Sequence, residues 1–249
     1  MIKDMTGIVL TKKIINKSYF ILSVKIEDKL DAYGKPGQFY ELKVNNTQRL
    51  RIPISIYDVR DNVVDFMIKD IGAGTHELGL YNENESIQLM GPLGNTFRQA
   101  TDNENCLLIT GGVGYAPLFF FKKMNQQANI VWFHGGRDSQ EVFPADRIYT
   151  NDGSTGIKGF VTADLKVYFN ENKVDRILTC GPRIMMKHIV DIAQDHVKDI
   201  ETSLEEYMAC GMGVCYGCVT KIKNGDDFVY KTVCKDGPIF QGSEVIWDE

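Results

Sequence analysis

Four of the six cysteines in this chain of 249 residues lie within one 25-residue window. They are Cys210, Cys215, Cys218 and Cys234, with the spacing C-x4-C-x2-C, then fifteen residues and the fourth cysteine. This is the spacing of plant-type [2Fe–2S] sites, in which a tight loop supplies three thiolates and a separate segment supplies the last. The window therefore predicts a [2Fe–2S] cluster bound by these four residues.

Glycines between the ligands support this prediction. Gly211, Gly213 and Gly217 let the backbone fold closely round an inorganic core. A structural zinc site with four cysteine ligands is the alternative, but such sites usually contain two C-x2-C pairs and the window contains one. Of the two cysteines outside the window, we expect Cys106 to be a core residue.

The composition is that of a globular protein without a nucleic-acid or membrane partner. Apolar residues make up 43% and charged residues 24%, and the net charge is −5. No apolar run approaches the length needed to cross a bilayer, and the first residues lack a secretory signal. Clustered cysteines in a reducing compartment indicate metal ligation over disulfides, so we expect a cytoplasmic protein.

Apolar runs and turn signals divide the chain into three regions, which we expect to be domains spanning residues 1–100, 101–200 and 201–249. In the first, short apolar runs alternate with turn formers, which predicts a small antiparallel β-barrel. The last holds the cysteine window and an Asn-Gly hairpin signal at Asn224. The expected fold is thus an antiparallel β-barrel, an α/β parallel-sheet nucleotide-binding domain and a small C-terminal [2Fe–2S] domain.

The middle region alternates strands with helices. Its near-continuous apolar strands predict a parallel sheet covered by helices. In chain order, the expected strands and helices cover residues 105–110, 117–127, 130–133, 176–180 and 182–196. The last helix has one apolar face formed by Met185, Ile189, Ile192 and Ala193.

Two loops of this region each follow an expected strand and open an expected helix. The first contains Gly111, Gly112 and Gly114, and the second is formed by Cys180, Gly181 and Pro182. Glycines in this context let backbone amides approach a pyrophosphate at a helix N-terminus. The pair of loops predicts a dinucleotide cleft, in which Cys180 is either a small buried hydrophobe or a direct neighbour of the nicotinamide.

The residues after the second strand bear on the choice of coenzyme. Asp138 could hydrogen-bond a ribose 2′-hydroxyl, as in NAD, whereas Arg137 could accept the 2′-phosphate of NADP. These residues alone leave both coenzymes open.

The barrel region contains a possible anion site. Thr75 could cap a helical turn after a flexible glycine loop, and the free amides there suit a phosphate. Arg51 could be a cation beside this site, with the Ser55 hydroxyl aimed into the barrel mouth. The alternative is an ordinary surface arginine and an ordinary strand serine.

The order of these features resembles the ferredoxin–NADP reductase superfamily with a cluster domain appended: a barrel, Gly-Gly-Val-Gly-Tyr-Ala-Pro at residues 111–117, Cys-Gly-Pro and the cysteine window. More narrowly, residues 208–218 are similar to the electron-transfer subunits of type 1B dihydroorotate dehydrogenases. The resemblance implies an oxidoreductase subunit that pairs with an FMN-containing catalytic subunit in a heterotetramer of two plus two. Dihydroorotate would be oxidised at the partner's FMN, and electrons would pass through [2Fe–2S] and FAD to NAD+ in pyrimidine (UMP) biosynthesis.

The same resemblance implies which residues hold FAD. Pro53, Ile54 and Ser55 would line the isoalloxazine, Gly74 and Thr75 would contact the pyrophosphate, and Met67, Ile68 and Lys69 would lie along the cofactor. The family usually has an arginine three residues before the serine, where this chain has Ile52. Arg51 is one residue earlier, and the strand period of two points it to the opposite face. Either a bulge re-aims Arg51, or another cation such as Lys69 neutralises the pyrophosphate.

Because the cofactors supply the chemistry, we expect no catalytic side chain. The four histidines, His76, His134, His188 and His196, lack the spacing of metal ligands. A second hypothesis is a related subunit of a ferredoxin:NAD(P) transhydrogenase or sulfide dehydrogenase. Those relatives often replace one cluster cysteine by aspartate, so the four cysteines favour the first hypothesis. The non-enzymatic alternative is a zinc-stabilised interaction module.

Overall fold

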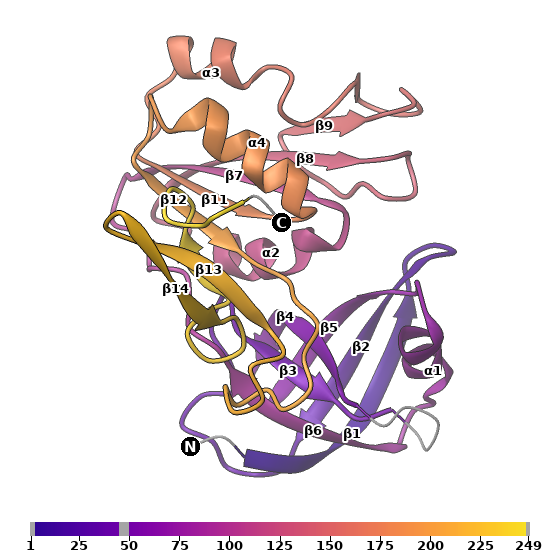
Figure 1. Cartoon of the computed structure of the whole chain (residues 1–249). Helices are drawn as coiled ribbons and strands as arrows, with labels where there is room; N and C mark the ends of the chain where they lie inside the picture. Colours follow the sequence, from indigo (N-terminus) through magenta and orange to yellow (C-terminus); the bar gives the residue numbers. More distant parts are fainter. Residues whose placement is uncertain (1–2, 45–49, 248–249) are drawn as a thin grey trace.

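The structure is a computed structural model that describes residues 3–44 and 50–247. Its first region is a closed antiparallel barrel (Figure 1), which confirms the prediction. In order around the barrel, its strands are β1 (Lys3–Ile14), β2 (Tyr19–Ile26), β5 (Val63–Lys69), β4 (Ile52–Arg60), β3 (Phe39–Leu42) and β6 (Ser86–Leu93). The short helix α1 (Ala73–Leu80) lies at one end of the barrel, in the connection from β5 to β6.

Alternating apolar residues form the barrel core. Leu22, Val24 and Ile26 of β2 all point inward, because side chains on a strand alternate between its two faces. In the antiparallel register Leu22 pairs with Phe66 of β5, and Val24 pairs with Val64. All five side chains are completely buried, and each contributes roughly 1.5–3 kcal/mol to folding.

The second region is a seven-stranded sheet. In spatial order its strands are β10 (Ile157–Lys158), β9 (Arg147–Thr150), β8 (Asn129–Gly136), β7 (Asn105–Gly111), β11 (Arg176–Cys180), β12 (Asp199–Ser203) and β15 (Ile239–Gln241). The first six are parallel, as predicted, and β15 is antiparallel. The helices are α2 (Tyr115–Met124), α3 (Leu165–Glu171) and α4 (Arg183–Ala193). Among the described residues, no helix is both long and apolar enough to cross a membrane.

The first of these helices, α2, starts and ends earlier than its predicted range of residues 117–127. It starts at Tyr115 because a 3-10 turn (Gly112–Gly114) continues directly into it. It ends at Met124 because the Asn125 side chain donates to the carbonyl of Phe121 at 2.8 Å and accepts from the amide of Ala100 at 2.8 Å. These two bonds tie the end of the helix to the segment that enters the sheet.

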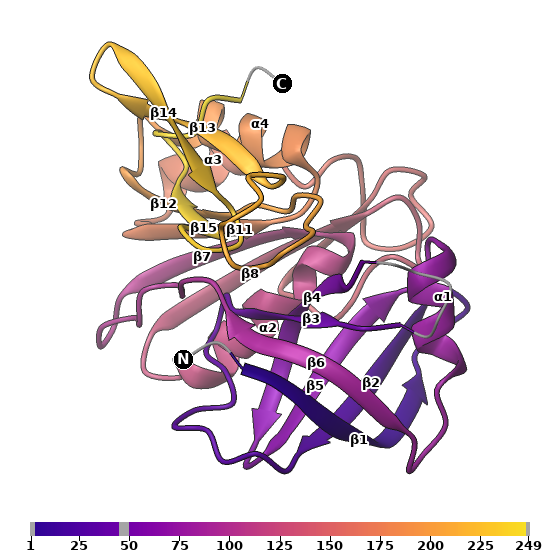
Figure 2. The same ribbon diagram turned by 60° about the horizontal axis from the view of Figure 1, so that its bottom comes forward.

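The cysteine-containing segment packs between the barrel and the sheet. Strands β13 (Val219–Asn224) and β14 (Asp227–Thr232) form the predicted hairpin, which projects from the body of the molecule (Figure 2). The division expected at residue 200 falls inside β12, and β15 returns to the same sheet.

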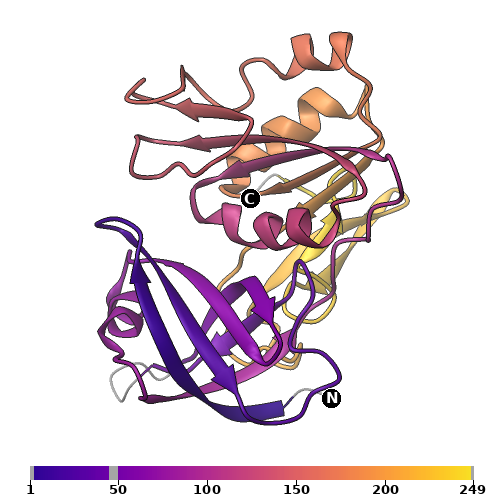
Figure 3. The same cartoon turned by 180° about the vertical axis from the view of Figure 1, so that it is seen from behind.

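Helix α2 joins the barrel to the sheet and lies between them (Figure 3). The Tyr57 ring of β4 stacks on the Phe119 ring of α2 at 4.2 Å between centroids. Tyr19 and Met67 of the barrel belong to the same buried cluster as Phe121. The shared core fixes the edge of the sheet that carries the glycine loops against the barrel.

Candidate cofactor sites

A pocket of about 610 Å³ opens between the barrel, α2 and the segment that follows β12. Eight of the nine residues predicted to hold FAD line it: Arg51, Pro53, Ile54, Ser55, Met67, Ile68, Lys69 and Thr75. The ninth, Gly74, is next to Thr75 in α1 and is not a lining residue. The lining also includes Val113 and Ala116, so the pocket reaches the helix that follows the first glycine loop.

One end of the pocket is the start of α1. Gly72 is the N-cap, and the Thr75 hydroxyl accepts hydrogen bonds from the amides of Ile71 and Gly72 at 3.0 and 3.1 Å. Thr75, the third residue of α1, thus holds the turn that leads into this helix. A Cβ added to Gly72 would meet no described residue within 4 Å, which leaves room for a ligand beside the first turn of α1.

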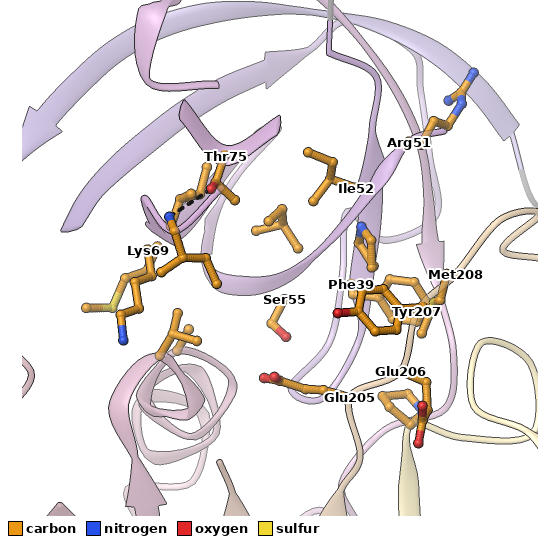
Figure 4. Close-up of a pocket in the computed structure, with 18 of the residues that line it drawn as sticks. Phe39, Arg51, Ile52, Ser55, Lys69, Thr75, Glu205, Glu206, Tyr207 and Met208 are labelled. Carbon is orange, nitrogen blue, oxygen red and sulfur yellow. Dashed lines mark hydrogen bonds between the residues drawn. The ribbon is translucent and has the colours of Figure 1, made fainter. Parts of the chain in front are cut away.

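Both predicted cations of the pocket are paired with carboxylates. Arg51 precedes the first residue of β4, and its Nη2 lies 2.8 Å from Asp4 Oδ2, away from Ser55 (Figure 4). Its Nη1 is buried and has no hydrogen-bond partner among the residues that the structure describes. Lys69 Nζ lies 2.6 Å from Oε1 of Glu141, which is in the connection from β8 to β9. A phosphate in the pocket would compete with these carboxylates or use the spare donor of Arg51.

Sequence reasoning missed the pocket wall that follows β12. This wall consists of Ser203, the last residue of β12, and of Glu205, Glu206, Tyr207 and Met208 after it. The Glu205 carboxyl faces Ser55 (Figure 4). Although it is open to the pocket, the surrounding protein desolvates it and raises its pKa. No motif marks these residues, because their position depends on where the chain crosses to the barrel after leaving the sheet.

The two predicted nucleotide loops touch each other at the carboxyl edge of the sheet. Strands β7 and β11 are paired in parallel, with Thr110 opposite Cys180. A Cβ on Gly181 would lie 2.9 Å from the amide nitrogen of Gly111, so close packing excludes a side chain here. Cys180 is buried, and burial raises the pKa of its thiol, so the group stays protonated. The pocket lining does not include Cys180.

The four cysteines of the window are brought together as two pairs. The amide of Cys215 donates to the sulfur of Cys210 at 3.4 Å, and the amide of Cys234 donates to the sulfur of Cys218 at 3.4 Å. The amide of Gly213 joins the two ends of the window by donating to Cys234 Sγ at 3.1 Å. Cys215 is exposed, while Cys218 and Cys234 are buried.

Backbone amides favour a thiolate at the first of these cysteines. The amides of Met212 and Cys215 donate to the Cys210 sulfur and lower its pKa to about 6. Gly211 has a φ of +62°, which favours glycine. A Cβ at Gly211 would also lie 2.7 Å from the carboxyl carbon of Glu41, a barrel residue that is 1% exposed. The loop therefore depends on glycine for both its conformation and its contact with the barrel.

Comparison with known proteins identifies the same segment. Residues 205–246 match the family described as the iron-sulfur cluster binding domain of dihydroorotate dehydrogenase B, and this range contains all four cysteines. A solved structure of an NADH-dependent reduced ferredoxin-NADP oxidoreductase, described for flavin-based electron bifurcation, contains a similar chain. It is 30% identical, with a TM-score of 0.83, and the match covers 97% of this chain and 90% of the other.

Two curated relatives match almost the full length. The electron transfer subunit of dihydroorotate dehydrogenase B (NAD(+)) from Clostridium perfringens is 37% identical over 237 residues, covering 91% of each chain. The subunit of the same name from Clostridium acetobutylicum is 34% identical over 242 residues, covering 91% of this chain and 95% of the relative. The chain belongs to the family of electron-transfer subunits of dihydroorotate dehydrogenase B.

Proposed function

We propose that this chain carries electrons from a dihydroorotate-oxidising partner through a [2Fe–2S] cluster and FAD to NAD+, in the synthesis of pyrimidines. The observation that carries the proposal is the convergence of four cysteines, joined two and two by amide-to-sulfur hydrogen bonds, in a chain with a pocket of about 610 Å³ and two glycine loops in contact. When bound, these groups supply one-electron transfer at the cluster and hydride exchange at the flavin. The protein supplies binding, orientation and exclusion of water.

The arrangement of the sulfurs favours a cluster over zinc. A structural zinc ion needs four ligands round one centre, whereas a [2Fe–2S] cluster needs two thiolates at each of two irons. The Cys215 amide donates to the Cys210 sulfur and the Cys234 amide donates to the Cys218 sulfur, so the cysteines are grouped two and two. Within residues 3–44 and 50–247, no three side chains of the metal-binding types are grouped tightly enough to hold a single ion.

The FAD site would be the pocket between the barrel and α2. Pro53, Ile54 and Ser55 would face the isoalloxazine, and the amides at the start of α1 would take the pyrophosphate. The spare Nη1 of Arg51 supports a role at a phosphate. NAD would lie across the two glycine loops, with its nicotinamide reaching the flavin.

The relatives are named as electron transfer subunits, which implies a catalytic partner. We propose that this partner holds FMN and that two copies of each chain form a heterotetramer. Apolar side chains surround the exposed Cys215: Met212 is 43% exposed, Val214 75% and Tyr216 64%. An exposed apolar patch of this kind suits a protein interface, and its position gives the partner a short route to the cluster. Thiols kept free for iron also favour the cytoplasm.

The second candidate keeps the cofactors and changes the partner. The solved relative described as a ferredoxin-NADP oxidoreductase supports it, at 30% identity. The identity to a curated subunit of dihydroorotate dehydrogenase B reaches 37%, and the match covers 91% of each chain, so the first candidate is preferred. The two candidates are distinguished by adding dihydroorotate to the complex of this chain with its catalytic subunit. Reduction of the complex supports the first candidate, and no reduction supports the second.

A cysteine exchange tests the order of the carriers. Cys215→Ser should abolish electron flow from the partner but leave NADH oxidation by artificial acceptors at the flavin. Cys106→Ser, at a buried cysteine of β7 outside the window, is the matched control and should keep both activities. Loss of both activities in Cys215→Ser, with FAD still bound, would contradict the proposed sequence of carriers.

A further inference from the structure

Glu141 joins two cations that come from different regions of the chain. Its Oε1 accepts hydrogen bonds from Lys69 Nζ at 2.6 Å, from Arg137 Nε at 3.0 Å and from Arg137 Nη2. Its Oε2 accepts from the backbone amide of Arg137 at 3.2 Å. Lys69 ends β5 in the barrel, and Arg137 directly follows β8 in the sheet. The carboxylate therefore occupies an anion site built by both regions.

The loop around this carboxylate is fixed. The Glu141 amide donates to the Asp138 carbonyl at 3.1 Å, and the Gln140 amide donates to Asp138 Oδ1 at 2.8 Å. A Cβ on Gly136 would lie 2.9 Å from the Glu141 Cβ, so the loop closes tightly on the strand end. The Glu141 side chain is 9% exposed, and the Arg137 side chain is 73% exposed. The bond to Lys69 holds the carboxylate in place when the exposed arginine moves.

The clasp formed by Lys69, Glu141 and Arg137 lies beside the first glycine loop. Gly135 of β8 is paired with Gly111 of β7, so Arg137 emerges at the carboxyl edge that carries this loop. In α/β domains of this type, the residues after the second strand meet the ribose 2′ position of the coenzyme: an acidic residue takes a 2′-hydroxyl and an arginine takes a 2′-phosphate. Arg137 is the arginine at this place, and its Nε and Nη2 are already bound to Glu141, a carboxylate that it shares with Lys69.

We propose that Glu141 is a specificity-determining residue that makes the site take NAD and reject NADP. It holds the Nε and Nη2 of Arg137 and thereby keeps a carboxylate directly beside the guanidinium that a 2′-phosphate would bind. Like charges brought together at a binding site oppose binding, whereas an uncharged 2′-hydroxyl meets no such penalty. This inference rests on the proposed function, because it concerns how the proposed nicotinamide coenzyme is chosen.

Binding of two nucleotide fragments tests the inference without relying on turnover. Titration calorimetry of the full-length, FAD- and cluster-loaded protein compares 2′,5′-ADP, which carries the 2′-phosphate, with 5′-AMP, which lacks it. In Glu141→Gln, the ratio of affinities should move toward 2′,5′-ADP by about tenfold or more. The further change Arg137→Gln should return the ratio to the wild-type value, because the arginine released by the first change is the phosphate's partner.

Two controls keep the test specific. Asp152→Asn removes one negative charge from the neighbouring loop, where the carboxylate accepts from the Ser154 amide at 2.9 Å, and should move the ratio by less than about twofold. Arg137→Gln alone should also have less than a twofold effect, because the Nε and Nη2 of this arginine are already bound to Glu141. An unchanged ratio in Glu141→Gln, or a large loss of 2′,5′-ADP binding in Arg137→Gln alone, would overturn the inference. Absence of 5′-AMP binding in every variant and the wild type would instead overturn the proposed function itself.

Discussion

Gly114 and Cys180 are in contact where the two nucleotide loops meet: a Cβ added to Gly114 would lie 2.3 Å from the Cys180 carbonyl oxygen. The neighbouring atom is backbone, so it cannot move aside as the end of a flexible side chain could. The glycine at 114 is therefore required by close approach of two main chains, one leaving β7 and the other leaving β11. This contact sets the spacing of the loops across which NAD is proposed to lie.

Gly114→Ala should separate these loops. We expect a loss of roughly 2 kcal/mol in the free energy of unfolding, from overpacking, and a higher KM for NADH. Gly79→Ala in α1 is the matched control, since its Cβ would meet only the Phe20 ring at 3.4 Å. Thermal unfolding and NADH oxidation by an artificial acceptor measure both effects. If Gly114→Ala and Gly79→Ala had the same thermal stability and the same KM for NADH, the contact between the loops would not exclude a side chain at position 114.

His134 should make stability depend on pH. The ring is completely buried in β8 and lies 2.8 Å from the Thr110 hydroxyl, and burial lowers its pKa from 6.5 to about 4. At pH values between these two pKa values, the unfolded chain binds a proton at His134 that the folded chain does not bind. The contribution of the neutral histidine to the free energy of unfolding is therefore fully present above about pH 6.5 and is lost as the pH falls toward 4. Between pH 7 and pH 5, His134 should lower the free energy of unfolding by about 2 kcal/mol.

Urea unfolding of the wild type and His134→Gln at pH 7 and pH 5 checks this expectation. Other titrating groups contribute equally to both proteins, so the difference isolates the histidine. The variant should lose less stability than the wild type on acidification. The same loss in both proteins would mean that His134 is already charged, or free to become so, in the folded state.

Val214 should be part of the partner interface. Val214→Asp places a charge in the apolar patch beside the cluster loop and should weaken assembly with the catalytic subunit at least tenfold. Val167→Asp on α3 is the matched control, at a valine that is 57% exposed and remote from the cysteine window. Analytical ultracentrifugation of mixtures measures assembly, and absorbance verifies that the cluster is retained. Normal assembly of a cluster-loaded Val214→Asp protein would show that this face is not the interface with the catalytic subunit.

Arg176 should be the most sensitive buried ion-pair residue in the sheet. Its side chain is fully buried, lies 3.4 Å from Glu104 and 3.1 Å from Glu201, and donates to the Arg98 carbonyl at 2.8 Å. Arg176→Met removes the cation bound to Glu201 and leaves Glu104 paired with Arg98 alone, and it should cost about 3–5 kcal/mol in the free energy of unfolding. Lys173→Met, at a residue with a 79% exposed side chain, should cost less than about 1 kcal/mol. Urea unfolding measures the free energy of unfolding of both variants. A similar loss in Arg176→Met and Lys173→Met would contradict the special importance of the buried ion pairs of Arg176.

The regular parts of the fold could be predicted because local patterns determine them. Alternation in β2 and the continuous apolar run of β7 follow directly from which faces are buried. The apolar face of α4 was also predicted, although its buried residues are centred on Met186, Ile189 and Val190. Met185 instead packs near Gly111, because α4 must also cover the glycine loops.

The remaining features depend on contacts between distant segments. Nothing near Arg51 in the sequence indicates that its guanidinium pairs with Asp4. The position of Glu205 opposite Ser55 depends on the path of the chain after β12 (Figure 4). Pairing of Arg137 with Glu141 is local, but the addition of Lys69 requires the barrel to be docked on the sheet. Side chains at such junctions become predictable only once the domains are placed together.

The visible spectrum of anaerobically purified protein, recorded before and after addition of NADH, tests the electron-transfer function most directly. A protein that carries FAD and a [2Fe–2S] cluster should show flavin bands together with a broad iron–sulfur absorption, and both should bleach when NADH is added. A colourless protein that contains zinc and no flavin would contradict the electron-transfer function and leave the interaction module as the explanation for the cysteine window.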